Sequence, residues 1–405
     1  MTDSLKELKQ RGMNLAATQT IKETMTKFRQ HPLQKILESR IAIIDGAMGT
    51  TIRTYGMTEA DIRGERFRNS TKDLKNNGDL FSLTQPQMIC DIHRRFLEAG
   101  ADIIETNTFG ATSITQSEFF VDDPRERGGR KDPEFYQKII DDPFLGNLAW
   151  EINETSARQC REWADRVTSE TGRQRFVAGA IGPLTVSLSN SPDADDAGFR
   201  VVTFDLVKAA YAQQVRALIA GGSDLLLVET IFDSLNAKAA LVAIREVFDQ
   251  DGLTASGREL PVMISAAVGR GGETMISAQT IEAFWNAVKH VKPLSVGLNC
   301  SLGPDLMYPF LAQLSEKSNA AISCYPNAGL PNPLSVTGFD DAPLATMIWP
   351  ALTTIRQPVE EMARLAAELF IKYSPRRNGW PDPMPRHLLA HRLLVRNSTA
   401  PPAAP

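Results

Sequence analysis

Cysteine is scarce in this sequence, and no two cysteines are adjacent. Only four occur among 405 residues, namely Cys90, Cys160, Cys300 and Cys324. These are too few for a disulfide framework in a chain of this length, so we expect reduced thiols, in the core or at a metal site, and a cytoplasmic protein. The sequence also has no apolar run close to the ~20 residues of a membrane helix. Its first residues contain no apolar segment of the kind that directs secretion.

A surplus of basic charge is missing as well. Lys and Arg number 44 against 48 Asp and Glu, so the formal net charge is −4. Proteins that bind nucleic acid usually present a basic face to the phosphate backbone. We therefore expect neither a nucleic acid nor a membrane as a partner. With 42% hydrophobic and 23% charged residues, the composition is that of a globular protein.

The sequence does contain a repeated alternation of short apolar runs and longer helical patterns. Seven apolar runs are strand candidates, at residues 41–45, 101–106, 175–182, 224–230, 261–268, 294–300 and 320–329. The helical stretches between them give a βαβ rhythm, which favours an α/β fold of the (β/α)₈ TIM-barrel type. A doubly wound open sheet is the competing fold, but no GxGxxG motif follows the first run.

Three stretches depart from this rhythm. Residues 1–35 have helical spacing and predict an N-terminal helical extension without catalytic residues. Residues 121–145 are polar and rich in turn formers, so we interpret them as a surface insertion. After Leu334 there is no room for the crossover of about ten or more residues that another parallel strand requires. We therefore expect an incomplete barrel over residues 36–334. Residues 336–339 should fill its eighth strand position poorly or not at all.

Polar residues collect where the predicted strands end. The active sites of such barrels lie at the carboxyl ends of the strands. The sequence places there Asp45, Glu105, Asn107, Glu229, Asn299 and Cys300. A lone cysteine is most often a small buried hydrophobic residue, but Cys300 ends a strand beside Asn299. For Asp45 and Glu105, a hydrogen bond to backbone is as good an explanation as contact with a substrate.

Six segments resemble a known family, in the order of the chain. They are IIDGAMGTTIR (43–53), IIETNTFGATSI (103–114), GAIGPLTVSLS (179–189), VETIFDSLNAKAAL (228–241), GLNCSLGPDLM (297–307) and YPNAGLPNPLS (325–335). Together they are similar to the homocysteine-binding barrel of cobalamin-dependent methionine synthase. The resemblance implies a (β/α)₈ barrel that transfers a methyl group from methylcobalamin to homocysteine, giving methionine. It also implies that cobalamin- and folate-binding modules are supplied in trans.

The same resemblance implies a zinc site. In that family, one thiolate from the GLNC strand end and an adjacent Cys-Cys pair from a GGCCG segment hold zinc, and the sulfur of homocysteine is the fourth ligand. By analogy Cys300 is a metal ligand that acts in catalysis through zinc, which stabilises thiolates. The substrate-binding residues implied are Asp45, Gly46, Met48, Glu105, Asn107, Glu229 and Asn299. Of these, Glu229 suits the ammonium group of the substrate, and the backbone of residues 46–49 suits its carboxylate.

The chain departs from this pattern at the zinc ligands. It contains no Cys-Cys pair, and no cysteine follows Cys324. We expect Cys324 in the core rather than at the mouth of the barrel. His387 and His391 have helical spacing, but no Glu lies between them as in zinc proteases. Two of the three thiolates are therefore missing, which puts activity in doubt.

The end of the chain suggests a second origin. Residues 335–371 and 385–399 resemble the C-terminal end of the effector-binding domain of lactose-repressor-type regulators, and a Pro/Ala tail closes the 335–405 fragment. The resemblances imply a chimera. One alternative function is a cobalamin-independent homocysteine methyltransferase with a sulfonium or betaine donor. Another is a non-catalytic relic or ligand-binding fusion, which the missing cysteine pair favours.

Overall fold

The computed structural model describes residues 31–46, 48–327, 337–339, 353–356 and 392–394. Contacts divide the chain into two units, which are described separately. The described part of the first unit ends at Asn327 and includes a six-stranded sheet, whereas the second contributes a three-stranded sheet. Predictions for residues 1–30, for His387 and His391, and for most of the regulator-like fragment lie outside the described residues.

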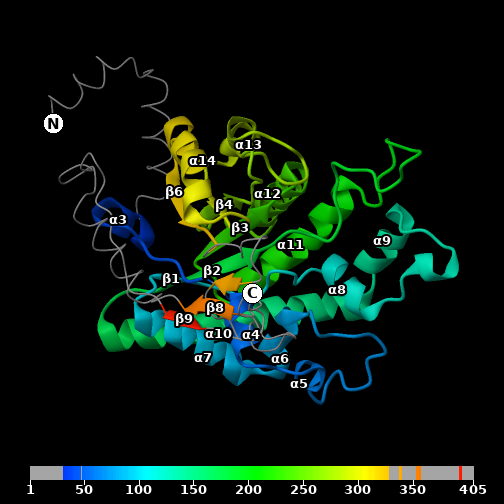
Figure 1. The fold of residues 1–405 in the computed structure, drawn as a ribbon, viewed down its shortest axis with the longest axis horizontal. Helices are drawn as coiled ribbons and strands as arrows, with labels where there is room; N and C mark the ends of the chain where they lie inside the picture. Colours follow the sequence, from blue (N-terminus) through cyan, green and yellow to red (C-terminus); the bar gives the residue numbers. More distant parts are fainter. Residues whose placement is uncertain (1–30, 47, 328–336, 340–352, 357–391, 395–405) are drawn as a thin grey trace, which may run out of the picture. The chain divides into compact units, whose positions relative to one another are not determined.

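Six parallel strands follow one another in the sheet in the order of the sequence. They are β1 (Ile103–Glu105), β2 (Phe176–Ile181), β3 (Leu225–Ile231), β4 (Val262–Ala266), β5 (Ser295–Asn299) and β6 (Ala321–Tyr325). Sequential parallel strands joined by helices are the arrangement of a TIM barrel. The sheet curls into part of such a barrel (Figure 1), so six of the seven predicted strands are confirmed.

The first predicted strand, residues 41–45, is reduced to a single parallel bridge between Ile44 and Ile103. The N–H of Asp45 donates to the carbonyl of Ile103 at 2.9 Å, and the carbonyl of Ile43 accepts from Ile103 at 3.1 Å. Arg40 holds the start of the segment through two hydrogen bonds of 2.6 Å to Asp102. The segment therefore lies beside β1, but within the described part of the chain it has a ladder partner on that side alone.

Helices occupy the connections between the strands. They are α3 (Pro32–Ser39), α4 (Met48–Thr54), α5 (Glu59–Arg63), α6 (Phe81–Thr84), α7 (Pro86–Ala99), α8 (Ser113–Phe120), α9 (Pro133–Ile140), α10 (Pro143–Thr171), α11 (Phe204–Ala220), α12 (Ser234–Gln250), α13 (Ile281–Val288) and α14 (Pro304–Lys317). Asp142 caps α10 by accepting the N–H groups of Phe144 and Leu145, and Gly172 ends it in the left-handed conformation. Within the described residues, no helix is long and apolar enough to cross a membrane.

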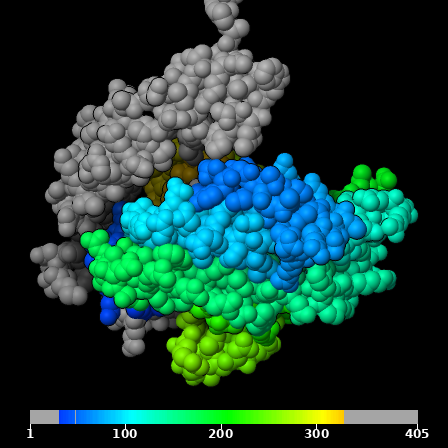
Figure 2. Space-filling view, turned by 90° about the horizontal axis from the view of Figure 1, so that it is seen from below, coloured from blue at the N-terminus to red at the C-terminus, as the bar shows by residue number. Residues whose placement is uncertain are grey.

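Helices α7 and α10 pack against each other. In Figure 2 the light-blue surface of α7 and the green surface of α10 lie next to each other on one face of the first unit. Farther along the chain, α11 contacts β2, α12 contacts β3, and α14 contacts both β5 and β6. The outer face of the sheet is therefore covered in chain order, as in a barrel.

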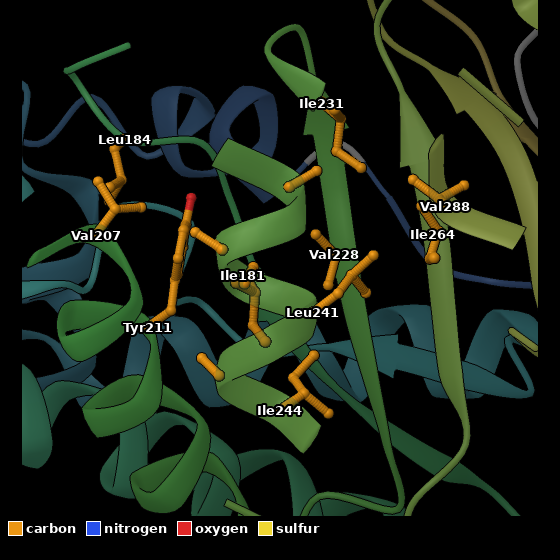
Figure 3. Close-up of a cluster of buried hydrophobic side chains, with 14 of the residues drawn as sticks. Ile181, Leu184, Val207, Tyr211, Val228, Ile231, Leu241, Ile244, Ile264 and Val288 are labelled. Atoms are coloured by element: carbon orange, nitrogen blue, oxygen red, sulfur yellow. The ribbon is translucent and has the colours of Figure 1, made fainter. Parts of the chain in front are cut away.

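Apolar side chains fill the space between this outer face and the helices. Ile181 and Val228 lie near Tyr211 of α11 and Leu241 of α12, and Ile264 lies beside Val288 of α13 (Figure 3). A second cluster lies inside the curl of the sheet, where Leu33 of α3 packs with residues at or near the starts of the strands, Phe176, Leu225, Met263 and Leu294. Helix α3 thus packs against the amino-terminal end of the strands.

Strand β6 is less buried than the strands before it. Its outward side chains Ile322 and Cys324 are exposed, and its inward ones are half-buried. The sulfur of Cys324 contacts that of Met307 in α14 at 3.8 Å. The expectation of a core thiol is therefore wrong, because α14 contacts this face of β6 but leaves Cys324 exposed. Successive residues of a strand point to opposite faces, so Cys324 points away from the inward-facing Tyr325.

The second unit contributes β7 (Thr337–Phe339), β8 (Thr353–Arg356) and β9 (Arg392–Leu394). Strand β7 pairs in parallel with β8, which pairs antiparallel with β9. Residues 337–339 thus belong to a separate mixed sheet and not to the six-stranded one, in agreement with the expectation that they do not complete the barrel. Eight barrel strands are not present among the described residues.

Gly297 allows β5 and β6 to approach closely. A Cβ at this position would overlap the carbonyl oxygen of Ser323. We expect Gly297→Ala to lower the free energy of unfolding by about 1–3 kcal/mol, because β6 must move outward. In the control Gly78→Ala, a Cβ meets nothing within 4 Å, so the effect should be smaller. Urea unfolding measures both, and equal effects would contradict this packing of β5 and β6.

Candidate functional site

Three carboxyl groups converge where the strands end. Asp45 is 7% exposed and Glu229 is 6% exposed. Glu105 lies close enough to both for their negative charges to raise its pKa, and the charge of Glu229 also acts on Asp45. Burial raises the pKa of Glu229 to about 7. Burial also raises the pKa values of Asp45 and Glu105 well above the usual range, and the nearby charge of Glu229 adds to both. The unliganded site therefore disfavours three negative charges together.

The acceptor atoms of these carboxyl groups are only partly satisfied. Oδ1 of Asp45 accepts the backbone N–H of Glu105 at 2.9 Å. Oε2 of Glu229 accepts the hydroxyl of Tyr325 across a long 3.4 Å. Oε1 of Glu105 is buried and has no hydrogen-bond partner among the described residues. An unpaired buried acceptor costs about 1–3 kcal/mol, so the arrangement favours a ligand that brings N–H donors and positive charge.

The side chain of Asn299 is fully buried and joins neighbouring strand ends. Its Oδ1 accepts from the hydroxyl of Ser265 at 2.7 Å and from the N–H of Thr230 at 3.1 Å. Its Nδ2 donates to Oγ1 of Thr230 at 2.7 Å and to Sγ of Cys300 at 3.1 Å. All four hydrogen-bonding positions of the amide are thus used within the protein. Asn299 positions Cys300 and β3, and it has no hydrogen bond left for a ligand.

Cys300 follows β5 in a strained backbone conformation. Its φ is 54°, that of Ser301 is 50°, and that of Thr230 at the end of β3 is 54°. Left-handed backbone at residues other than glycine costs about 1–3 kcal/mol each and is concentrated at functional sites. Burial raises the pKa of the Cys300 thiol, while the Asn299 amide opposes that rise. The free thiol is therefore protonated at neutral pH.

A protein zinc site requires three or four protein ligands. Across the ranges that the structure describes, no three His, Cys, Asp or Glu residues are placed to hold a metal ion. Of the other cysteines, Cys90 lies on α7, Cys160 is buried on α10, and Cys324 points outward from β6. The described residues therefore do not fit a three-thiolate zinc site.

Three further residues predicted for the site lie outside the carboxyl cluster. Gly46 directly follows Asp45, and Met48 begins helix α4, so part of the predicted loop is helical. The side-chain amide of Asn107 donates to the carbonyl of Gly78 at 2.9 Å and to the hydroxyl of Ser82 at 3.1 Å. Asn107 therefore joins the segment after β1 to residues 78–82, which lie directly beside it.

Sequence reasoning missed Thr230, Ser265 and Tyr325. Thr230 and Ser265 have no motif that sets them apart, and only the folded network around Asn299 reveals them. Tyr325 had a usable signal. It lies within the predicted strand 320–329 and ends the observed β6, and its hydroxyl reaches Glu229 on the inner face.

Comparison with solved structures gives the same fold. The Escherichia coli homocysteine methyltransferase MmuM in its metallated form is 19% identical, with a TM-score of 0.52 over 74% of this chain and 88% of that chain. Its oxidized form gives the same identity and TM-score, with 87% of that chain covered. At this level of identity the likeness concerns the fold alone, and it supports the TIM-barrel-like architecture.

The comparison with protein families is more specific. The family described as homocysteine S-methyltransferase matches residues 42–351. The match extends beyond residue 335, where we expected a regulator-like fragment to begin. The resemblance of residues 335–399 to lactose-repressor-type regulators is not supported by these comparisons. Since the match takes in most of the sequence, the chain belongs to the homocysteine S-methyltransferase family.

Proposed function

We propose that the chain binds homocysteine at the carboxyl ends of its strands and presents the sulfur for methylation, which gives methionine. The observation that carries this is the cluster of Glu105 with the buried residues Asp45 and Glu229. Within it, the buried Oε1 of Glu105 has no hydrogen-bond partner among the described residues. The ammonium group of an amino acid brings one positive charge and three N–H donors. It would satisfy the free acceptor and stabilise the ionised form of Glu229.

The remaining groups of the site fit the other end of the substrate. Tyr325 orients Glu229, and Asn299 fixes Cys300 through its Sγ. We infer that the sulfur of homocysteine lies on the Cys300 side of the cluster. Cys300 is the residue we propose as a metal ligand, although the described residues do not complete a zinc site.

The methyl donor that we propose is methylcobalamin carried by another module, with a folate-binding module also acting in trans. Six segment resemblances to the cobalamin-dependent type support this donor. A sulfonium or betaine donor is the alternative, and the same acceptor site would serve it. A chain that binds homocysteine without methylating it is the third possibility, and the incomplete set of metal ligands favours it. Methionine formation from homocysteine with each donor distinguishes the three.

Substitution of Glu229 tests the ammonium subsite. We expect Glu229→Gln to weaken homocysteine binding about tenfold or more at neutral pH, because a charge-assisted pair becomes a neutral one. Titration calorimetry on the full chain measures this. The control Glu98→Gln removes a surface carboxylate that pairs with Arg94 and should leave the affinity unchanged. Equal affinity of the parent and Glu229→Gln would remove Glu229 from the site.

Stability without ligand should depend on pH through the same residue. The folded pKa of Glu229, about 7, lies above the ordinary value of 4.5, so the folded state holds this proton more tightly than the unfolded state. The resulting stabilisation is complete below the unfolded pKa and is lost as the pH rises through about 7. As the pH rises from 4.5 to about 7, the free energy of unfolding of the parent should fall. The fall in Glu229→Gln should be about 1–3 kcal/mol smaller. Urea unfolding that shows parallel pH profiles would contradict the burial of this carboxyl group.

Metal binding tests the role of Cys300. If purified protein carries zinc, Cys300→Ala should abolish it, whereas Cys90→Ala, on the partly exposed helix α7, should not. Elemental analysis together with thiol titration gives the stoichiometry. Unchanged zinc content in Cys300→Ala would remove this residue from any metal site.

A further inference from the structure

A cavity of about 670 Å³ lies apart from the strand-end cluster, and the insertion at residues 121–145 forms one of its walls. The opposite wall is the loop between β2 and α11, from Thr185 to Val201. In Figure 1 helices α8 and α9 and this loop lie on the side of the sheet away from β6. No carboxyl group of the strand-end cluster lines the cavity. Its volume is within the range of ~300–1,000 Å³ that small-molecule sites occupy.

The acidic groups in the walls are already engaged. Both oxygens of Glu118 accept from Lys131, at 2.9 and 2.8 Å, and Lys131 is largely buried. Asp193 accepts the N–H of Asp195 at 3.0 Å with one oxygen and a long 3.4 Å contact from Arg130 with the other. The cavity therefore has few free acceptors to offer a ligand.

Its donors, in contrast, are largely unused. The guanidinium of Arg130 lies 3.4 Å from the centre of the Phe199 ring, and the contact with Asp193 is its one polar interaction within the described residues. Arg125 bonds Asp123 through Nε and Nη2, which leaves Nη1 without a partner among those residues. An arginine stacked on an aromatic ring has a fixed plane and presents its N–H edge to ligands.

Tyr136 adds a hydroxyl group to this wall. The residue is 1% exposed and lines the cavity. Its hydroxyl makes no hydrogen bond to any residue that the structure describes, although buried tyrosine hydroxyls usually have a partner. Its ring is fixed edge-on against Phe135 at 5.0 Å. An unpaired hydroxyl in the wall of a cavity is a second sign of a missing ligand, independent of the arginines.

We propose that this cavity is a second binding site, for a small organic oxyanion with a carboxylate or phosphate group. Arg130 contacts the oxyanion through two parallel N–H donors, the geometry that guanidinium shares with carboxylate and phosphate. Arg125 and Tyr136 donate to its remaining oxygens. The insertion, which supplies all three residues, thus builds a ligand site beside the barrel. The proposal does not depend on homocysteine binding.

The test uses the full chain and two probes, inorganic phosphate and succinate, in separate calorimetric titrations. We expect at least one to bind, and the stronger probe identifies the oxyanion class. Arg130→Ala should weaken that binding about tenfold or more, and Tyr136→Phe should weaken it severalfold. The matched control is Arg127→Ala, an arginine of the same insertion that pairs with Asp122 at 2.8 Å and does not line the cavity.

Absence of binding by both probes at about 10 mM would overturn the proposal. Equal weakening in Arg130→Ala and Arg127→Ala would also overturn it, because the binding would then reflect general surface charge. Circular dichroism checks that each variant folds. If Arg130→Ala does not fold, Arg130→Lys and Tyr136→Phe decide between the outcomes, because both preserve the packing. Arg130→Lys removes the bidentate contact, and Tyr136→Phe removes the hydroxyl contact. Unchanged affinity in both would overturn the proposal as well.

Discussion

The hydrogen bonds of the Asn299 amide are the interaction on which the geometry of the candidate site depends. One side chain joins the ends of β3, β4 and β5 through Thr230, Ser265 and Cys300. These contacts hold Thr230 and Cys300 in left-handed conformations that neither residue prefers. The amide also holds the Cys300 thiol through Sγ, and it fixes Thr230, the residue directly after Glu229. Loss of the amide would release both sides of the site at once.

This arrangement does not require a closed barrel. Glu105, Glu229, Asn299 and Tyr325 belong to strands within the six-stranded sheet, and Asp45 is tied to β1 by the N–H of Glu105. Helix α3 packs apolar side chains against the amino-terminal end of the strands, and the three carboxyl groups of the candidate site lie at the opposite end. The partial barrel therefore retains the acidic side of the site. What the described residues do not supply is the partner ligands of Cys300.

The sequence predicted most of the sheet because buried parallel strands read as short apolar runs that end in polar residues. It also placed Glu105, Glu229 and Cys300 correctly at strand ends, because parallel strands bring their carboxyl ends together. The exposure of Cys324 could not be predicted, since the burial of a strand residue depends on what covers its outer face. The engagement of Asn107 by Gly78 and Ser82 depends on a loop distant in sequence. The sequence predicted a surface insertion at 121–145, but the cavity that these residues form with residues 185–201 could be found only in the fold.

The central claim is that buried carboxyl groups beside Cys300 form the subsite for the ammonium group of homocysteine. A crystal structure of the full chain grown with L-homocysteine tests this most directly. We expect the ammonium nitrogen within hydrogen-bonding distance of Glu105 or Glu229, and the sulfur on the side of Cys300. Homocysteine bound elsewhere, with Oε1 of Glu105 still lacking a partner, would contradict the account.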